Sequence, residues 1–76
     1  MEKLLQLLKR IRPDVDFTGE TGLVDDNILD SFDIITIVSE INEVFKVSIN
    51  VADMEPENLN SINAMWELIE RLKSLE

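Results

Sequence analysis

The pair Asp30-Ser31 is the place in this chain where residue types and position suggest chemistry. It precedes a run of apolar residues at helical spacing, so the Ser31 hydroxyl is expected at a helix start, exposed and near free backbone N–H groups. Those N–H groups and the helix dipole would stabilise a phosphodiester anion attached to the hydroxyl. Asp and Ser are also common helix caps. Two interpretations therefore stay open: a structural cap, and a serine that another enzyme modifies.

The composition argues against Ser31 being a catalytic nucleophile. The chain has no His and no Cys, so it lacks an imidazole base, a thiol and the usual zinc ligands. An unactivated hydroxyl is a poor nucleophile, and Lys46 lies at the far end of the same expected helix. We therefore expect no catalytic residue, no resident metal and no enzyme activity.

Acidic residues dominate the chain, which has 7 Lys and Arg against 16 Asp and Glu and a formal net charge of −9. Between residues 13 and 70 there are 14 acidic residues and one basic residue, Lys46. This charge would repel nucleic acid and would steer basic partners to the chain, although it could also serve solubility alone. We expect no nucleic-acid partner.

The length and hydropathy indicate one small folded domain over residues 1–76. With 45% hydrophobic residues, a chain of 76 residues can form one compact core but has little room for a substrate cavity. No apolar run approaches the length that spans a bilayer, and no basic-then-apolar leader is visible. We expect a cytoplasmic monomer with no membrane insertion.

Three segments with helical apolar spacing must position Ser31. The first covers residues 1–12 and is stopped by Pro13, because a residue before proline is disfavoured in the α region. The second runs from Asp30 to about Lys46. The third follows a cap at Asn60 or Ser61, and its expected buried stripe is Ile62, Met65, Trp66, Ile69 and Leu72.

The connections between these segments carry apolar residues of their own. Residues 13–30 predict an ordered crossover loop pinned to the core by Phe17, Leu23, Val24, Ile28 and Leu29. Alternation at Val47, Ile49 and Val51 predicts an extended loop with two or three side chains inward, and Asp53 and Pro56 predict one short helical turn. The predicted fold class is all-α: a small four-helix bundle with three main helices, one short helix and a long ordered loop between the first two.

Ile35 stands apart from the apolar stripe of the second predicted helix. It falls on the side of that helix with Ser31, Ser39 and Asn42, which is otherwise polar. It can be an incidental isoleucine at the edge of the core, or a hydrophobic anchor for a partner.

The segment Leu29-Asp30-Ser31-Phe32 and the order of elements around it resemble the acyl and peptidyl carrier proteins. The resemblance covers essentially the full length, including residues 40–49 and residues 53–62, the latter similar to D-alanyl and peptidyl carriers in particular. Phe32 stands where Leu or Met is more usual, and Thr36 and Ser39 stand where fatty-acid carriers more often have an acidic and an apolar residue. These differences favour a specialised carrier that serves an adenylating ligase or a secondary pathway.

The resemblance implies what the chain would do. A phosphopantetheinyl transferase would attach 4′-phosphopantetheine from coenzyme A to Ser31, and the thiol of the arm would hold an acyl or aminoacyl group as a thioester. Asp30 and Phe32 would flank the attachment, with Asp30 near a metal ion during the transfer. Loading ligases or synthases with basic docking patches would bind a surface formed by Asp33, Ile35, Thr36, Glu40, Glu43 and Met54.

A second hypothesis uses the same residues differently. The chain would be a non-catalytic acidic helical adaptor that binds a basic partner, and Ser31 would be a helix cap and nothing more. The two hypotheses differ in whether Ser31 can be modified.

Overall fold

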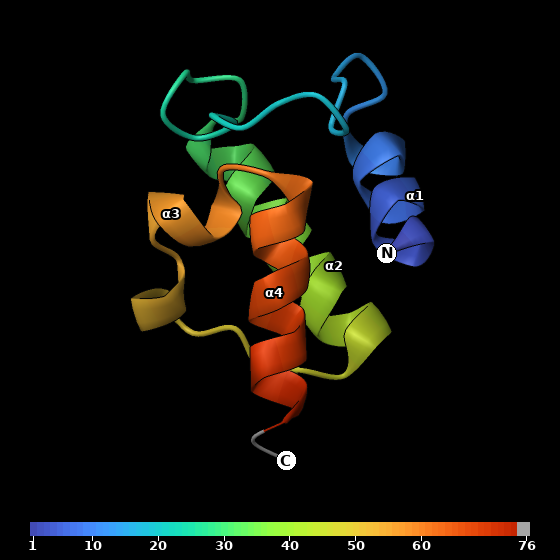
Figure 1. Cartoon of the computed structure of the whole chain (residues 1–76), viewed down its shortest axis with the longest axis vertical. Helices are drawn as coiled ribbons and strands as arrows, with labels where there is room; N and C mark the ends of the chain where they lie inside the picture. The colour runs from blue at the N-terminus through green and yellow to red at the C-terminus, as the bar shows by residue number, and fades with distance from the viewer. Residues whose placement is uncertain (75–76) are drawn as a thin grey trace.

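A computed structural model describes residues 1–74 (Figure 1). Four α-helices, α1 (Glu2–Ile11), α2 (Ser31–Phe45), α3 (Pro56–Leu59) and α4 (Ile62–Lys73), are joined by loops and by one turn of 3₁₀ helix, η1 (Val51–Asp53). The prediction of three main helices and one short helix is confirmed, whereas η1 was not predicted. No helix among these residues is long and apolar enough to cross a membrane.

Helix α1 ends at Ile11, two residues before Pro13, as predicted from that proline. Arg12, directly before Pro13, has φ −133° and ψ 81°, outside the α region. The buried side chains of α1 are Leu4, Leu7 and Leu8, and the helix packs against both α2 and α4. The C-terminal end of α1 therefore leads directly into the long loop before Ser31.

Residues 13–30 form an ordered loop that crosses one end of the bundle, at the top of Figure 1. Phe17 and Leu23 are fully buried, and Leu29 is buried just before α2. The loop is also tied to the junction of α3 and α4, because Asn60 Oδ1 accepts the N–H groups of Val24 and Asp25, both at 3.0 Å. The prediction of an ordered crossover loop pinned to the core is confirmed.

The segment after α2 buries two apolar side chains, within the predicted two or three. Lys46 ends the helix in the left-handed conformation, at φ 58° and ψ 44°. Val47 and Ile49 then face the core, and Ile49 N–H donates to Asn42 Oδ1 at 2.8 Å. Val51 is 85% exposed. Val51 is the one of the three that stays outside the core, because the chain turns into η1 at this residue and the extended alternation stops.

The last two helices begin as their sequence signals indicate. Pro56 occupies the first turn of α3, where a missing N–H costs no helical hydrogen bond. Of the two cap candidates for α4, Ser61 is the one used, and its Oγ accepts Ala64 N–H at 3.0 Å. Asn60 holds the long loop instead.

The buried stripe of α4 differs in detail from the expected one. Ile62, Met65 and Ile69 are buried as predicted, but Leu68 is buried as well. Trp66 is only partly buried and meets the ring of Phe45 edge to face, with centroids 5.9 Å apart. Leu72 is also partly buried.

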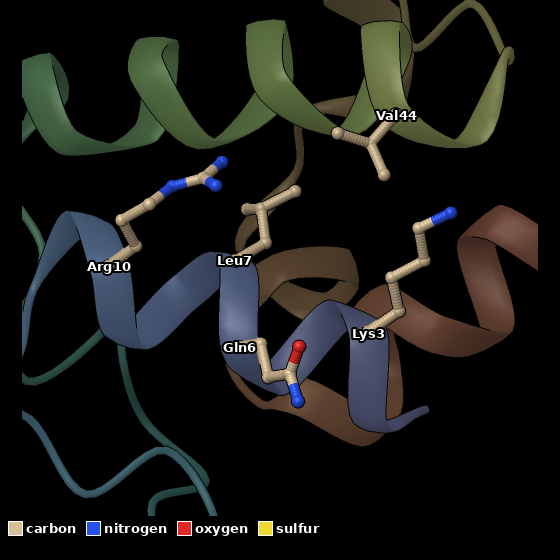
Figure 2. Close-up of a pocket in the computed structure, with 5 residues that line it drawn as sticks. All are labelled: Lys3, Gln6, Leu7, Arg10 and Val44. Atoms are coloured by element: carbon tan, nitrogen blue, oxygen red, sulfur yellow. The ribbon is translucent and has the colours of Figure 1, made fainter.

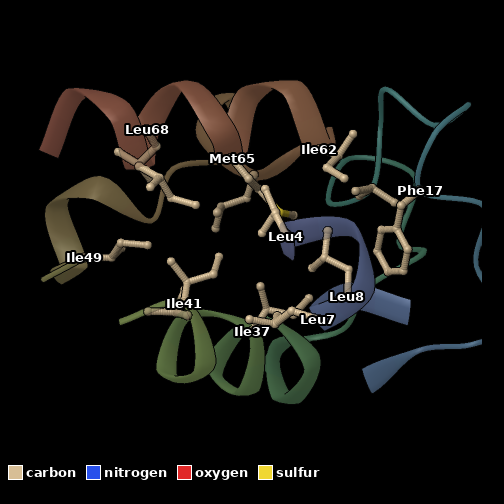
Figure 3. Close-up of a cluster of buried hydrophobic side chains, with 14 of the residues drawn as sticks. Leu4, Leu7, Leu8, Phe17, Ile37, Ile41, Ile49, Ile62, Met65 and Leu68 are labelled. Carbon is tan, nitrogen blue, oxygen red and sulfur yellow. The ribbon is translucent and has the colours of Figure 1, made fainter. Parts of the chain in front are cut away.

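Side chains of α1, α2 and α4 meet in one apolar core, with Phe17 closing it from the loop (Figure 3). No polar or charged residue among residues 1–74 is buried. The largest fully buried side chains are Phe17, Leu4, Leu8, Leu23, Ile37, Ile41, Met65, Leu68 and Ile69. The polar groups that could do chemistry therefore lie at the surface.

Candidate functional site

Ser31 is the first residue of α2, and it is exposed. Within residues 1–74 its hydroxyl neither donates nor accepts a hydrogen bond. The backbone N–H groups of Ser31 and Phe32 likewise have no acceptor in this described part, as expected for the first turn of a helix. The serine oxygen is thus accessible and lies at the positive end of a helix of 15 residues.

The neighbouring Asp30, not Ser31, is the cap of α2. Asp30 has extended backbone angles, and its Oδ1 accepts the N–H of Asp33 at 2.8 Å. In return, Asp33 Oδ2 accepts the N–H of Asp30 at 3.4 Å, which completes a capping box. The interpretation of Ser31 as the helix cap is therefore wrong, because Asp30 already fills that role.

Arg12 joins the end of α1 to the start of α2. Its Nε and Nη2 bind both carboxylate oxygens of Asp14, at 3.1 and 3.0 Å, while Nη1 donates to Ile28 O at 3.2 Å and forms an ion pair with Asp33. The hydrogen bonds with Asp14 and then with Asp33 raise the pKa of Arg12 above its ordinary value. The bond from Arg12 also lowers the pKa of Asp14. No motif in the sequence marks Arg12 as part of the site.

Two of the acidic residues expected to face partners are paired with arginines at the C-terminal end of α1 and just after it. The side chain of Asp33 is only 14% exposed and lies against Arg12. Glu40 is 35% exposed, and its Oε1 lies 3.3 Å from Arg10 Nη2. Glu43 is exposed and has no ion-pair partner among residues 1–74. The acidic side of α2 is thus partly neutralised within the chain itself.

The exposed apolar residues near Ser31 lie on α2 away from Asp33 and Glu40. Phe32 is 77% exposed, and Ile35, four residues after Ser31 and hence on the same helical face, is 62% exposed. Thr36 is half-buried, and its hydroxyl donates to the carbonyl of Phe32 at 3.0 Å. A hollow of about 570 Å³ follows along α2, lined by Ile35, Val38, Ser39, Asn42, Val51 and Met54. The structure thus brings Ile35 and Met54 together beside the helix that begins at Ser31.

A second hollow lies between α1 and α2 (Figure 2). It measures about 220 Å³ and is lined by Lys3, Gln6, Leu7, Arg10 and Val44. Lys3 Nζ also lies 6.0 Å from the centre of the Phe45 ring. This basic hollow contains none of the predicted site residues, so the candidate site is the start of α2 and the face that follows it.

Comparison with known proteins identifies the class of protein to which this chain belongs. The chain belongs to the phosphopantetheine attachment site family, whose model matches residues 2–69. Among curated proteins it is similar to the acyl carrier protein of Buchnera aphidicola subsp. Baizongia pistaciae (strain Bp), with 35% identity over 54 residues, 71% of this chain and 67% of that protein. The resemblance to carrier proteins is confirmed, and the cofactor of the family is covalently attached 4′-phosphopantetheine.

The start of α2 fits such a cofactor. Attachment needs a hydroxyl that another enzyme can reach, and Ser31 is exposed and makes no competing hydrogen bond within residues 1–74. A phosphodiester anion there would find the two free N–H groups of Ser31 and Phe32 and the positive end of the helix dipole. The residues present are therefore suited to hold the phosphate end of the arm.

Proposed function

We propose that Ser31 is the attachment residue and that the chain is a non-catalytic acyl or aminoacyl carrier formed by a single domain, residues 1–76. The observation that carries this proposal is the exposed Ser31 hydroxyl at the start of α2, which has no structural role because Asp30 caps the helix. A serine used only as a cap would accept a first-turn N–H group. Ser31 is free of that task and available to a modifying enzyme.

In the attachment step, Ser31 Oγ attacks the phosphorus of coenzyme A that bears the pantetheine. A new oxygen–phosphorus bond forms, the bond from that phosphorus to the adenosine bisphosphate portion breaks, and the hydroxyl proton passes to a base of the transferase or to water. The N–H groups of Ser31 and Phe32 stabilise the resulting anion, and Asp30 flanks it. When attached, the arm supplies a thiol that holds the carried group as a thioester.

The acidic charge of the chain and the exposed apolar side chains near Ser31 indicate the kind of partner. A phosphopantetheinyl transferase and loading ligases or synthases with basic docking patches would meet a surface formed by Phe32, Ile35, Thr36, Glu43 and Met54, with Asp33 and Glu40 at its α1 side. The chain would act as a cytoplasmic monomer. Complementary charges in such contacts raise association rates more than affinity, which suits short-lived complexes.

Incubation with coenzyme A and a broad-specificity phosphopantetheinyl transferase tests the proposal. We expect intact-protein mass spectrometry to show one added arm of roughly 340 Da on each chain. Peptide mapping should place the arm on Ser31 and on neither Ser39 nor Ser48, which are exposed too. An unmodified chain, under conditions that convert an established carrier completely, would overturn the proposal.

Replacing Ile35 by Asp should weaken the reaction with partner enzymes without unfolding the chain. Ile35 is 62% exposed, so a carboxylate there costs little in the free protein but places a charge in an apolar contact. We expect kcat/KM with a loading enzyme to fall about tenfold, with a melting temperature close to wild type. Ile35→Leu is the matched control and should keep its activity within about twofold. A large drop in the melting temperature of Ile35→Asp would show that Ile35 belongs to the core.

A further inference from the structure

One guanidinium group contacts the chain on both sides of Ser31, at a backbone carbonyl before it and at a side-chain carboxylate after it. Arg12 Nη1 donates to the carbonyl of Ile28, three residues before Ser31, and pairs with the carboxylate of Asp33, two residues after it. The Arg12 side chain is 28% exposed, and its other two donor nitrogens form hydrogen bonds with Asp14. A planar guanidinium can form this set of bonds at once, because its donors lie in a fixed fork.

The contact with Asp33 acts on the cap of α2. Asp33 is the residue whose N–H binds Asp30 Oδ1 and whose carboxylate accepts the N–H of Asp30. The oxygen that receives the Asp30 N–H, Oδ2, is the same oxygen that pairs with Arg12. Arg12 therefore fixes the carboxylate on which half of the capping box depends.

We propose that Arg12 is a positioning residue for the modification of Ser31: through Asp33 and the Ile28 carbonyl it holds the first turn of α2 in the conformation that presents the serine hydroxyl. This inference rests on the proposed function of Ser31. Arg12 does not bond to Ser31 itself, so its effect passes through the backbone of the turn.

Loss of Arg12 should change the population of this conformation. The Asp33 carboxylate would lose its cation and the Ile28 carbonyl its donor, so we expect the first turn of α2 to sample other arrangements. When only a fraction of the molecules is competent to bind, the apparent affinity equals the intrinsic affinity multiplied by that fraction. The transferase would select the competent fraction, so KM for the carrier should rise while kcat stays near wild type.

Arg10 provides a matched control. It lies in the last turn of α1, two residues before Arg12, and its ion pair with Glu40 joins α1 to α2, at 3.3 Å. Glu40 lies about two helical turns beyond Asp33, however, far from the first turn. Arg10→Gln makes the same change of charge as Arg12→Gln and also removes an ion pair to α2, without touching the start of that helix.

The experiment measures kcat and KM of a phosphopantetheinyl transferase for the full chain and its variants, well below their melting temperatures. We expect Arg12→Gln to raise KM about fivefold with kcat within about twofold, and Arg10→Gln to leave both within about twofold of wild type. A purely structural role of Arg12 would lower the melting temperature and leave KM unchanged. Equal KM values for wild type and a folded Arg12→Gln variant would overturn the inference.

Two further variants keep the test decisive if Arg12→Gln does not fold. Arg12→Lys keeps the charge but lacks the forked donors of a guanidinium. We therefore expect a smaller rise in KM than for Arg12→Gln, about twofold. Adding Arg12→Lys to Asp33→Asn should raise KM no further than Asp33→Asn alone, because both act on one contact; full additivity would contradict the inference. If the wild-type chain itself takes no arm, the proposed function of Ser31 fails, a result distinct from equal KM values among modified chains.

Discussion

A Ser31→Ala variant is expected to gain no phosphopantetheine arm under conditions that convert the wild-type chain completely. Alanine lacks the oxygen that must bond to phosphorus, so the loss should be total instead of partial. Ser31 is exposed, forms no hydrogen bond within residues 1–74 and does not cap α2, so the fold should be unaffected. We expect the free energy of unfolding to change by less than about 0.5 kcal/mol, measured by urea denaturation beside intact-protein mass spectrometry.

Ser48→Ala is the control for this prediction, because Ser48 is exposed and lies outside the helices. It should take the arm at the wild-type rate. Ser31→Asn separates the two hypotheses for the chain: the adaptor hypothesis expects both folding and function to survive, whereas the carrier hypothesis expects a folded chain with no arm. An arm on Ser31→Ala would show that another residue is the attachment site.

Replacing Phe17 by Ala should have the largest effect on stability. Phe17 is fully buried although it lies in the long loop, and it packs with α1 and α4 at one end of the core (Figure 3). Removing a buried phenyl ring costs about 3–5 kcal/mol. For 76 residues, the total free energy of unfolding is about 4–11 kcal/mol. The variant should therefore lose much of its stability, with a clear fall in the urea midpoint.

Phe32→Ala makes the same chemical change at a side chain that is 77% exposed. We expect its urea midpoint to stay close to that of the wild-type chain, within about 0.5 kcal/mol in free energy of unfolding. Comparing Phe17→Ala with Phe32→Ala thus shows how much of the stability loss comes from the burial of Phe17 and not from the residue type. If Phe17→Ala were as stable as Phe32→Ala, the loop would not be part of the core.

The sequence predicts the helices because apolar spacing and end signals agree in each of them. Pro13 and Pro56 act on their own neighbours, so the end of α1 and the start of α3 follow directly. Val51 shows where such local reasoning stops. Three alternating residues are too few to reveal that the chain turns into η1, so they left open whether Val51 lies inward, and its side chain is exposed.

At the candidate site, too, local signals are predictable from the sequence, whereas contacts between distant residues are not. Asp30 and Ser31 are both good caps, so sequence alone could locate the helix start but could not assign the cap to one of them. The ion pair between Arg12 and Asp33 joins residues 21 apart, and Asn60 reaches Val24 over 36 residues. Contacts of this kind depend on how the helices pack, which no local pattern encodes. The pairing of Asp33 with Arg12 could therefore not be foreseen from the sequence.

The edge-to-face contact between Phe45 and Trp66 gives the molecule an optical probe of its own. The chain has one Trp and no Tyr, so fluorescence excited at the long-wavelength edge of its aromatic absorption, where Phe does not absorb, comes from Trp66 alone. Phe45 is the last residue of α2 and Ser31 the first, which places the indole's partner roughly 21 Å along the helix axis from the attachment point. Fluorescence should therefore track unfolding in apo and holo chains alike, without an added dye.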